Sequence, residues 1–262
     1  AVQFTDIYTD VHRRDLTINA LFFDLDTNEV VDLVGGIEDI KNGVVRSVGD
    51  AAERFDDDKL RILRAMRFAG RFGSEVDADI DKVLRKGVDM SNISGERIRD
   101  EFIKGIKTSK STKHFLGLLE KYDLFEDIFP NLMTGMKFME SNDPDLVVAT
   151  LLDTNDNVAK KLNAIKYPTD QATNIEFLIS LKGFTEDKVI NAVKKRGITK
   201  LSDAQILEFA RFHGLNIKLI QALLRFQLTI DGNEVMEKFG LKGAALGEKI
   251  KELEINNFRA TL

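Results

Sequence analysis

The sequence predicts an α+β protein in which a small β-containing segment precedes a long body built only of helices. Two β-rich runs, residues 18–24 and 29–33, flank Asp26-Thr27-Asn28, which is the spacing of a β-hairpin. From Asp50 onward, apolar residues recur with the period of a helix. With 43% hydrophobic and 31% charged residues among 262, the chain is long and apolar enough to fold around one or two cores.

Local signals along the chain justify each element in turn. Residues 2–7 suggest a first strand, Gly35-Gly36 ends the second strand of the hairpin, and residues 44–48 form a last apolar segment of strand character. Helices are expected at residues 51–72, 80–87, 94–106, 115–122, 159–164, 175–181, 187–195, 203–213, 217–228 and 235–239. The three prolines fall between these segments and leave the helices uninterrupted.

The composition excludes several classes of site. The chain contains no cysteine and only three histidines. Disulfides, thiolate metal sites and thiol catalysis are therefore excluded, and no histidine cluster with metal-ligand spacing occurs. We accordingly expect no metal ligands within this chain. No apolar run reaches the length of a membrane span, so we expect a cytoplasmic protein without membrane contact.

The charge balance does not by itself indicate a nucleic-acid-binding protein. The formal net charge is −5 and the isoelectric point is about 5.4. Lysine-rich stretches nevertheless occur at residues 104–113 and 194–200. Each is either a local basic patch on an acidic body or an ordinary solvated helix face.

The first segment of chemical interest begins with two arginines. Arg13, Arg14 and Asp15 lie at the start of an apolar strand-like run, with Asn19 four residues after Asp15. Arginine forks match phosphate oxygens, and Asp and Asn side chains bond ribose hydroxyls. The alternative is an ordinary salt-bridged turn.

The second segment is an arginine-rich helix. Arg61, Arg64 and Arg67 are spaced by three residues, so they drift by roughly 60° per step and together cover about a third of the helix circumference. An amphipathic surface helix normally mixes lysine and glutamate on its polar side. Arginines interleaved with Leu60 and Phe68 indicate instead a partly enclosed anionic ligand. The opposite side is apolar and contains Ile62, Ala65, Met66 and Ala69.

Asp58 and Arg61 are three residues apart, so their side chains are expected to converge on the helix surface. One interpretation is a weak intrahelical ion pair. The other is base recognition, because a carboxylate accepts from an exocyclic amine and a guanidinium donates to a ring nitrogen. Cytosine and adenine present that combination, whereas uracil and guanine present a carbonyl beside a ring N–H. The pair would therefore select C and A.

Four segments, in this order, resemble motifs of the class II tRNA nucleotidyltransferases, the CCA-adding enzymes and their bacterial poly(A) polymerase relatives. They are Arg13–Ala20 (RRDLTINA), Gly35–Asp39 (GGIED), Asp57–Phe68 (DDKLRILRAMRF) and Ser94–Ile98 (SGERI). Four ordered motifs over about 85 residues are more specific than any one of them alone. The helical body beyond them resembles the family only in general character.

The resemblance implies nucleotide-binding roles for Arg14, Asp58, Arg61, Arg64 and Arg67. Of these, Arg14 matches the position that holds the triphosphate, and Asp58 with Arg61 matches the protein template that reads the incoming base. The family's usual Glu-Asp is Asp57-Asp58 here, which keeps the reading carboxylate. Roles in ribose or phosphate binding, or in supporting the site, are implied for Arg13, Asp15, Asn19, Glu96 and Arg97.

The resemblance also implies a division of the chain. Residues 1–49 match the C-terminal part, or remnant, of a small nucleotidyltransferase β-sheet head. Residues 50–122 match the helical neck that carries the nucleotide-reading helix, and residues 123–262 match the RNA-binding helical body and tail. The expected partners are ATP, CTP and the 3′ end and acceptor/T arm of tRNA.

The reaction implied by the family is template-independent addition of C and A nucleotides to the tRNA 3′ end, with Mg²⁺ held by a head-domain Asp-x-Asp. That motif is expected before Arg13, whereas Asp24-Leu25-Asp26 follows it in a hairpin and is rejected as the metal site. The chain begins at Ala1 without an initiator methionine. We therefore expect no catalytic residue within the chain, and a missing N-terminal segment or separate head fragment to supply it.

Several functions stay open at this stage. Within the family, the motifs do not separate a CCA-adding enzyme from an A-adding enzyme or a poly(A) polymerase. The chain is a truncated enzyme, half of a split enzyme, or a non-catalytic tRNA-binding protein. A plain helical scaffold fits the composition but leaves the arginine helix unexplained.

Overall fold

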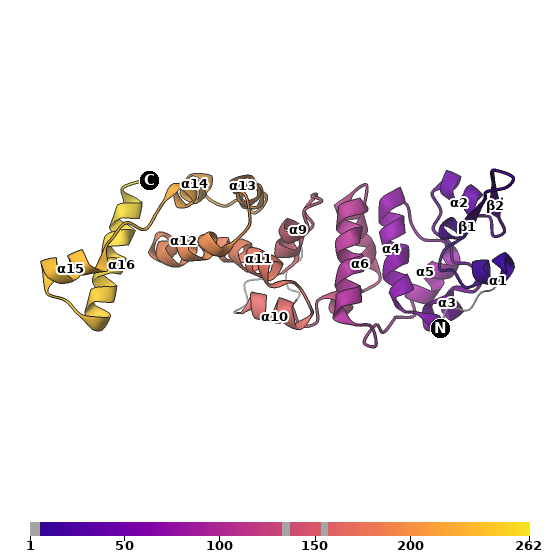
Figure 1. The fold of residues 1–262 in the computed structure, drawn as a ribbon, viewed down its shortest axis with the longest axis horizontal. Helices are drawn as coiled ribbons and strands as arrows, with labels where there is room; N and C mark the ends of the chain where they lie inside the picture. Colours follow the sequence, from indigo (N-terminus) through magenta and orange to yellow (C-terminus); the bar gives the residue numbers. More distant parts are fainter. Residues whose placement is uncertain (1–5, 133–136, 153–156) are drawn as a thin grey trace. The chain divides into compact units, whose positions relative to one another are not determined.

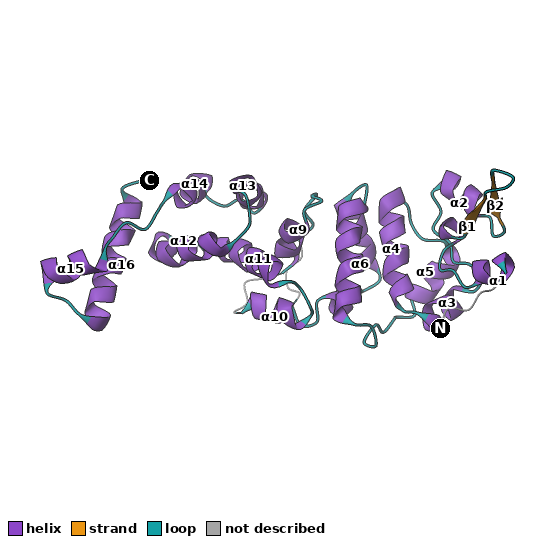
Figure 2. Cartoon of the chain, in the orientation of Figure 1, coloured by secondary structure: helices purple, strands orange, loops and turns teal. Residues whose placement is uncertain are grey.

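The computed structural model describes residues 6–132, 137–152 and 157–262 (Figure 1). It divides into two compact units, Ala1–Val147 and Val148–Leu262. The fold is α+β, as predicted, and strands occur only in one hairpin of the described residues (Figure 2). Among the helices of those residues, none combines the length and the apolar character needed to span a membrane. The division into head, neck and body stays a prediction.

The first described element is a helix, so the expected strand at residues 2–7 is wrong where it is described. Helix α1 covers Ile7–His12, and the Asp6 carboxylate begins it by accepting the N–H of Thr9 at 2.7 Å. This side-chain cap satisfies one of the free N–H groups at the helix start. Residues 2 and 4 of the expected strand lie outside the described residues.

The predicted hairpin is confirmed. A single 3₁₀ turn, η1 (Thr17–Asn19), precedes strand β1 (Leu21–Asp24), which pairs antiparallel with β2 (Glu29–Asp32). Phe23 lies opposite Val30 in this register. The connecting turn places Asn28 in the left-handed region with φ of 56°, which asparagine tolerates better than most residues.

A short helix that the sequence did not indicate follows the hairpin. The Asp32 carboxylate accepts four successive backbone N–H groups, from Val34 to Ile37, at 2.9–3.1 Å. Gly35, with φ of 81°, then starts α2 (Gly36–Asn42). Residues 44–48 form only isolated bridges, Leu16 to Ser47 and Val45 to Val76, so the expected last strand is not formed.

The long helix expected at residues 51–72 is broken in the structure. It consists of α3 (Ala51–Asp57) and α4 (Leu60–Phe72), with Asp58 extended between them at φ −155° and ψ 105°. The Asp58 carboxylate accepts the N–H of Leu60 at 3.1 Å. This local bond competes with helical pairing and explains the break, which the apolar periodicity alone did not reveal.

The other helices that lie wholly within the first unit are α5 (Ala78–Leu84), α6 (Gly95–Thr108), α7 (Thr112–Lys121) and α8 (Phe125–Ile128). Helices α6 and α7 pack against α4, whereas α5 packs against α3 and α8 against α6. Helices α4 and α6 lie side by side (Figure 1). The apolar side predicted for α4 is buried, because Ile62, Ala65, Met66 and Ala69 are all inaccessible to solvent.

Two glycines set the close packing of this group. A Cβ atom on Gly70 of α4 would lie 2.5 Å from Ser109 Oγ, and one on Gly105 of α6 would lie 2.1 Å from the ring of Phe115. The Phe115 ring is buried at 1% exposure and also packs against Phe102, with ring centroids 6.0 Å apart. The helices therefore approach more closely than any larger residue at these positions would allow.

The second unit is entirely helical in its described residues (Figure 2). Helix α9 (Pro144–Leu151) leads into it from the first unit. Then follow α10 (Val158–Ala164), α11 (Thr169–Leu181), the 3₁₀ turn η2 (Glu186–Lys188), α12 (Val189–Ile198), α13 (Asp203–Phe212), α14 (Ile217–Arg225), α15 (Gly232–Phe239) and α16 (Gly243–Arg259). Helix α16 was not predicted from the sequence. Most of its residues are exposed or half-buried, so its apolar residues do not recur clearly with the helical period.

The glycine packing leads to a paired test of stability. We expect Gly105→Ala to lower the free energy of unfolding by about 1–3 kcal/mol, because the added methyl group overlaps the buried Phe115 ring. Gly117→Ala, inside α7 with no atom near the added methyl group, should instead raise it by about 0.5–1 kcal/mol. Urea unfolding measures both, and a stabilised Gly105→Ala variant would contradict the packing argument.

Candidate nucleotide-binding site

The arginine side of α4 is partly enclosed, as the sequence predicted. The side chains of Arg61, Arg64 and Arg67 are only 18%, 32% and 12% exposed. Leu60 is buried on the same side, and the Arg67 guanidinium lies over the ring of Phe68 at 4.3 Å from its centroid. The three guanidinium groups therefore lie in a restricted, partly apolar setting in which their charges are weakly screened.

Arg64 and Arg67 belong to one ion-pair network, which we call the arginine network and which comprises Asp15, Arg64, Arg67 and Glu101. Arg64 Nε donates to Asp15 Oδ2 at 2.5 Å, and its Nη1 lies 3.4 Å from Glu101 Oε1. Arg67 Nε donates to Glu101 Oε2 at 2.7 Å. The network thus joins the N-terminal segment to α4 and α6.

The two carboxylates of the network are buried, Asp15 at 7% and Glu101 at 4% exposure. Burial alone would raise the pKa of Asp15, but the hydrogen bond and charge of Arg64 outweigh it and hold that pKa below its usual value. Burial correspondingly opposes the charge of Arg64, yet Asp15 and Glu101 raise the pKa of its guanidinium. Asp15 and Arg64 are therefore both charged near neutral pH.

Glu101 was missed by the sequence analysis, although a signal for it exists. The buried positions of α6 are Ile98, Glu101, Phe102, Gly105 and Ile106, which follow the spacing of an apolar helix stripe. A glutamate at such a position requires a buried cationic partner. The neighbouring arginine helix supplies two such cations, Arg64 and Arg67.

Asp58 and Arg61, predicted to converge, do not contact each other through their side chains in this structure. Asp58 Oδ2 accepts from Arg97 Nη2 at 2.7 Å. Arg61 donates to the carbonyls of Arg13 at 2.9 Å and Arg54 at 3.0 Å, and its Nη1 lies 3.5 Å from Asp57 Oδ2. The break before α4 explains the difference, since helical i,i+3 geometry does not apply to Asp58.

The first arginine segment is held by Asp10 of α1. Arg14 Nη2 lies 2.8 Å from Asp10 Oδ2, its Nη1 donates to the carbonyl of Asn19 at 3.1 Å, and its guanidinium lies 4.8 Å from the Phe22 ring centroid. Arg13 Nη2 donates to Asp10 Oδ1 at 2.5 Å. The Asn19 amide lies 3.3 Å from Asp15 Oδ1, so this segment is continuous with the arginine network.

The two residues predicted from the start of α6 behave differently. Ser94 caps the helix by accepting the N–H of Arg97, and Arg97 then reaches Asp58. Glu96 is exposed, and its Oε1 lies 3.9 Å from Arg99 on the same helix. Arg97 is thus brought into the site, whereas the described contact of Glu96 is local.

Of the two residues that resemble a metal-binding pair, Asp24 is engaged in its own hairpin turn. Asp24 Oδ1 accepts the N–H groups of Asp26 and Thr27 at 2.8 and 3.2 Å, so its carboxylate closes the hairpin turn. In the described part of the chain, no three His, Cys, Asp or Glu side chains gather so as to hold a metal ion. We derive no metal-dependent step from these residues.

The lysine-rich stretch at residues 194–200 is largely neutralised by neighbours. Lys195 lies 3.4 Å from Glu176, Arg196 lies 3.0 Å from Asp203, and Lys200 lies 3.0 Å from Asp170. The other stretch, at residues 104–113, contains Lys104 beside the buried Glu101 at 3.7 Å. Paired cations of this kind contribute little to a basic patch.

Known proteins match the chain over most of its length. The poly A polymerase head domain family matches residues 1–46, and the family described as the probable RNA and SrmB-binding site of polymerase A matches residues 84–136. The CCA-adding enzyme of Staphylococcus saprophyticus is 29% identical over 95% of this chain and 68% of its own length. Over most of its length the chain is therefore similar to CCA-adding enzymes, and over part of it to bacterial poly(A) polymerases.

Solved structures of CCA-adding enzymes share the fold. The enzyme of Bacillus stearothermophilus in complex with CTP has a TM-score of 0.65 at 22% identity, covering 98% of this chain and 70% of its own. The enzyme of Thermotoga maritima in complex with tRNA has a TM-score of 0.63 at 20% identity, covering 97% and 70%. The chain spans about two thirds of the length of the curated CCA-adding enzymes that it matches.

The arginine network leads to a test at its buried carboxylate. We expect Glu101→Gln to lower the free energy of unfolding by about 1–3 kcal/mol, because Arg64 and Arg67 lose the charge that they share. Glu120→Gln, an exposed glutamate on α7, is the matched control and should change it by less than about 0.5 kcal/mol. The measurement is urea unfolding at pH 7, and equal stabilities of the two variants would refute the network's structural role.

Proposed function

We propose that this chain forms the nucleotide-selecting and RNA-binding part of an enzyme that adds C and A nucleotides to the 3′ end of tRNA without a nucleic-acid template. The observation that carries the proposal is the hydrogen bond from Arg61 to the Arg13 carbonyl at 2.9 Å. It brings the base-reading position next to the arginine segment proposed to bind ribose and phosphate. The similarity to CCA-adding enzymes over 95% of the chain supports the same reaction class.

The base-reading pair keeps donors and acceptors for a nucleobase. Asp58 accepts from Leu60 N–H and Arg97, and a carboxylate offers about four acceptor positions. Arg61 carries five N–H groups, of which two are bonded to carbonyls at 2.9–3.0 Å. The remaining groups suit an exocyclic amine beside an unprotonated ring nitrogen, which cytosine and adenine share. Uracil and guanine would leave buried polar groups unpaired, which costs about 1–3 kcal/mol each.

The arginine network would position the triphosphate indirectly. Asp15 and Glu101 hold Arg64 and Arg67 in defined orientations, and a group fixed before binding loses less entropy when a ligand arrives. Arg14 is the residue proposed for the triphosphate itself. Its guanidinium would exchange Asp10 for phosphate oxygens, which also form bidentate, charge-assisted hydrogen bonds.

The charge distribution supports RNA binding by the second unit. Residues 1–147 contain 21 Lys and Arg against 29 Asp and Glu, whereas residues 148–262 contain 17 against 14. The net charge therefore changes from −8 to +3 between the units. A positive unit attracts the tRNA backbone even though the whole chain is acidic.

Mg²⁺ would be expected in this reaction class, and we propose that carboxylates other than Asp24 and Asp26 hold it. The support is the engagement of Asp24 Oδ1 with two backbone N–H groups of its own turn. ATP and CTP would be the nucleotide substrates. A head segment that is not among these 262 residues would supply the metal ligands.

A poly(A) polymerase is the second candidate, because the two matching families are described as parts of such enzymes. CCA addition is preferred, since the match to a CCA-adding enzyme extends over 95% of this chain. The two candidates differ in an observable product. A CCA-adding enzyme stops after three nucleotides, whereas a poly(A) polymerase continues to add A.

The proposed reaction is tested by nucleotide incorporation. We expect residues 1–262 with Mg²⁺ to transfer negligible labelled CTP or ATP onto tRNA that lacks its 3′ CCA. Fusion behind the N-terminal head segment of a CCA-adding enzyme should give defined CCA addition on sequencing gels. Clear incorporation by the chain alone would return Asp24 and Asp26 to consideration, and long A tails from the fusion would favour the poly(A) alternative.

Base selection is tested separately in the same fusion protein. We expect Arg61→Ala to reduce the preference for CTP and ATP over UTP and GTP at least tenfold, because the donor to the ring nitrogen is lost. Arg71→Ala, an exposed arginine on the same helix, is the control and should leave the preference unchanged. The ratio of kcat/KM values measures the effect. An unchanged ratio for Arg61→Ala would show that another group reads the base.

A further inference from the structure

A cavity of about 480 Å³ lies in the second unit, apart from the arginine helix of the first. One wall is α14, and the other is the segment after it together with residues 261–262. The polar and aromatic residues that line it include Lys218, Gln221, Arg225, Phe226, Gln227 and Thr229. Its volume is within the range of pockets that enclose small organic ligands.

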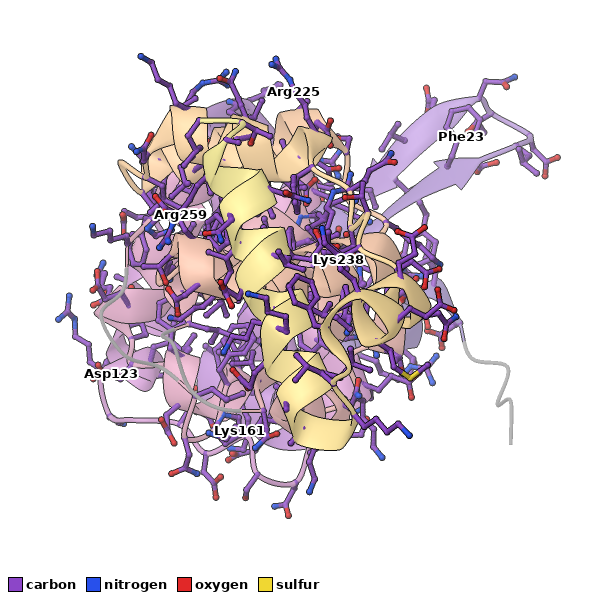
Figure 3. The ribbon with its side chains drawn as sticks, turned by 90° about the vertical axis from the view of Figure 1, so that its left-hand side faces the viewer. Phe23, Asp123, Lys161, Arg225, Lys238 and Arg259 are labelled. Atoms are coloured by element: carbon purple, nitrogen blue, oxygen red, sulfur yellow. The ribbon has the colours of Figure 1, made fainter. Side chains whose placement is uncertain are left out.

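The charged side chains that line this cavity are both positive. Lys218 and Arg225 are exposed, and neither forms an ion pair with any residue in the described part of the chain. They are seven residues apart on α14, which is about two turns or roughly 10 Å along one helix face. No Asp or Glu side chain lines the cavity. Arg225 stands clear of the ribbon in Figure 3. This contrasts with residues 194–200, whose cations are largely paired.

The far wall of the cavity is held in place by a buried carboxylate. Glu254 of α16 is 2% exposed, and its Oε1 accepts the N–H groups of Thr229 and Ile230 at 2.8 and 2.7 Å. Phe226 packs edge-on against the buried Phe258, with ring centroids 5.2 Å apart. The segment opposite α14 is therefore fixed before any ligand binds, which lowers the cost of binding.

We propose that this cavity is a second nucleotide-binding site, distinct from the base-reading helix. Lys218 and Arg225 would bind phosphate oxygens through charge-assisted hydrogen bonds. The amides of Gln221 and Gln227 offer both donors and acceptors to a base edge, and Phe226 offers an aromatic surface for stacking. The ligand is a nucleotide unit, either free in solution or an unstacked nucleotide of an RNA strand. Binding of an RNA nucleotide here rests on the proposed function, whereas binding of a free nucleotide does not.

The test is photolabelling of the full chain with two probes, followed by mass spectrometry of residues 218–229. The free-nucleotide probe is 8-azidoadenosine 5′-monophosphate, and the RNA probe is tRNA lacking its 3′ CCA and carrying 4-thiouridine. We expect at least one probe to label this segment in the unaltered chain. The double variant Lys218→Ala, Arg225→Ala should reduce labelling at least tenfold. Both residues are exposed, so folding should be retained, and circular dichroism checks this.

The matched control is Lys160→Ala, Arg211→Ala, which removes two exposed cations of the same unit outside the cavity. It should leave labelling of residues 218–229 unchanged. If the RNA probe is the source, the slope of log affinity for this tRNA against log salt should fall by about 1.4 in the cavity variant, since each single-strand phosphate contact contributes about 0.7.

Labelling by the azido probe assigns the site to free nucleotides, and labelling by the thiouridine tRNA alone assigns it to RNA. The proposal is overturned if neither probe labels residues 218–229 or if labelling survives in the cavity variant. It is also overturned if the control variant loses as much labelling as the cavity variant. Failure of the proposed function has a different signature. In that case fluorescence anisotropy would detect no binding of this tRNA by the unaltered chain, whereas free-nucleotide labelling of the cavity would be unaffected.

Discussion

The sharing of the Glu101 carboxylate between Arg64 and Arg67 is the interaction on which the first unit depends. Glu101 comes from α6, the arginines from α4, and Asp15, which also binds Arg64, from the N-terminal segment. Three stretches that are distant in the sequence are thereby fixed by four alternating charges. Such a network is costly to desolvate and stabilises the fold only while every member is present. Its benefit is orientation, because it holds cationic side chains at a partly enclosed surface where an anion can reach them.

Much of the fold could be predicted from local patterns. The hairpin follows from alternating apolar residues, and the buried side of α4 follows from its helical period. The failures have local chemical causes. Asp58 breaks the long helix through its own bond to Leu60 N–H, and the four hydrogen bonds accepted by Asp32 lead the chain into an unexpected helix, α2. Periodicity does not register single side chains that bond to the backbone.

The contacts of the predicted site residues could not be predicted from the sequence. Asp58 and Arg61 are neighbours in sequence, yet their partners are Arg97 and the Arg13 carbonyl, which are 39 and 48 residues distant along the chain. Only the tertiary structure decides between such contacts. Glu101 was predictable in principle, because a charged residue at a core position of α6 requires a cation. The spacing of Lys218 and Arg225 places them on one face of α14, but the sequence does not show that the chain end, residues 261–262, lies beside that face.

The close approach of Phe115 of α7 to Gly70 of α4 and Gly105 of α6 has a consequence for how this protein evolves. The Phe115 ring occupies the space beside both glycines, so neither helix can shift without displacing a buried aromatic side chain. The arginine side of α4 therefore inherits its rigidity from the opposite side of the same helix. Changes in side-chain volume at these buried positions will limit which arrangements of the arginine network the chain can keep.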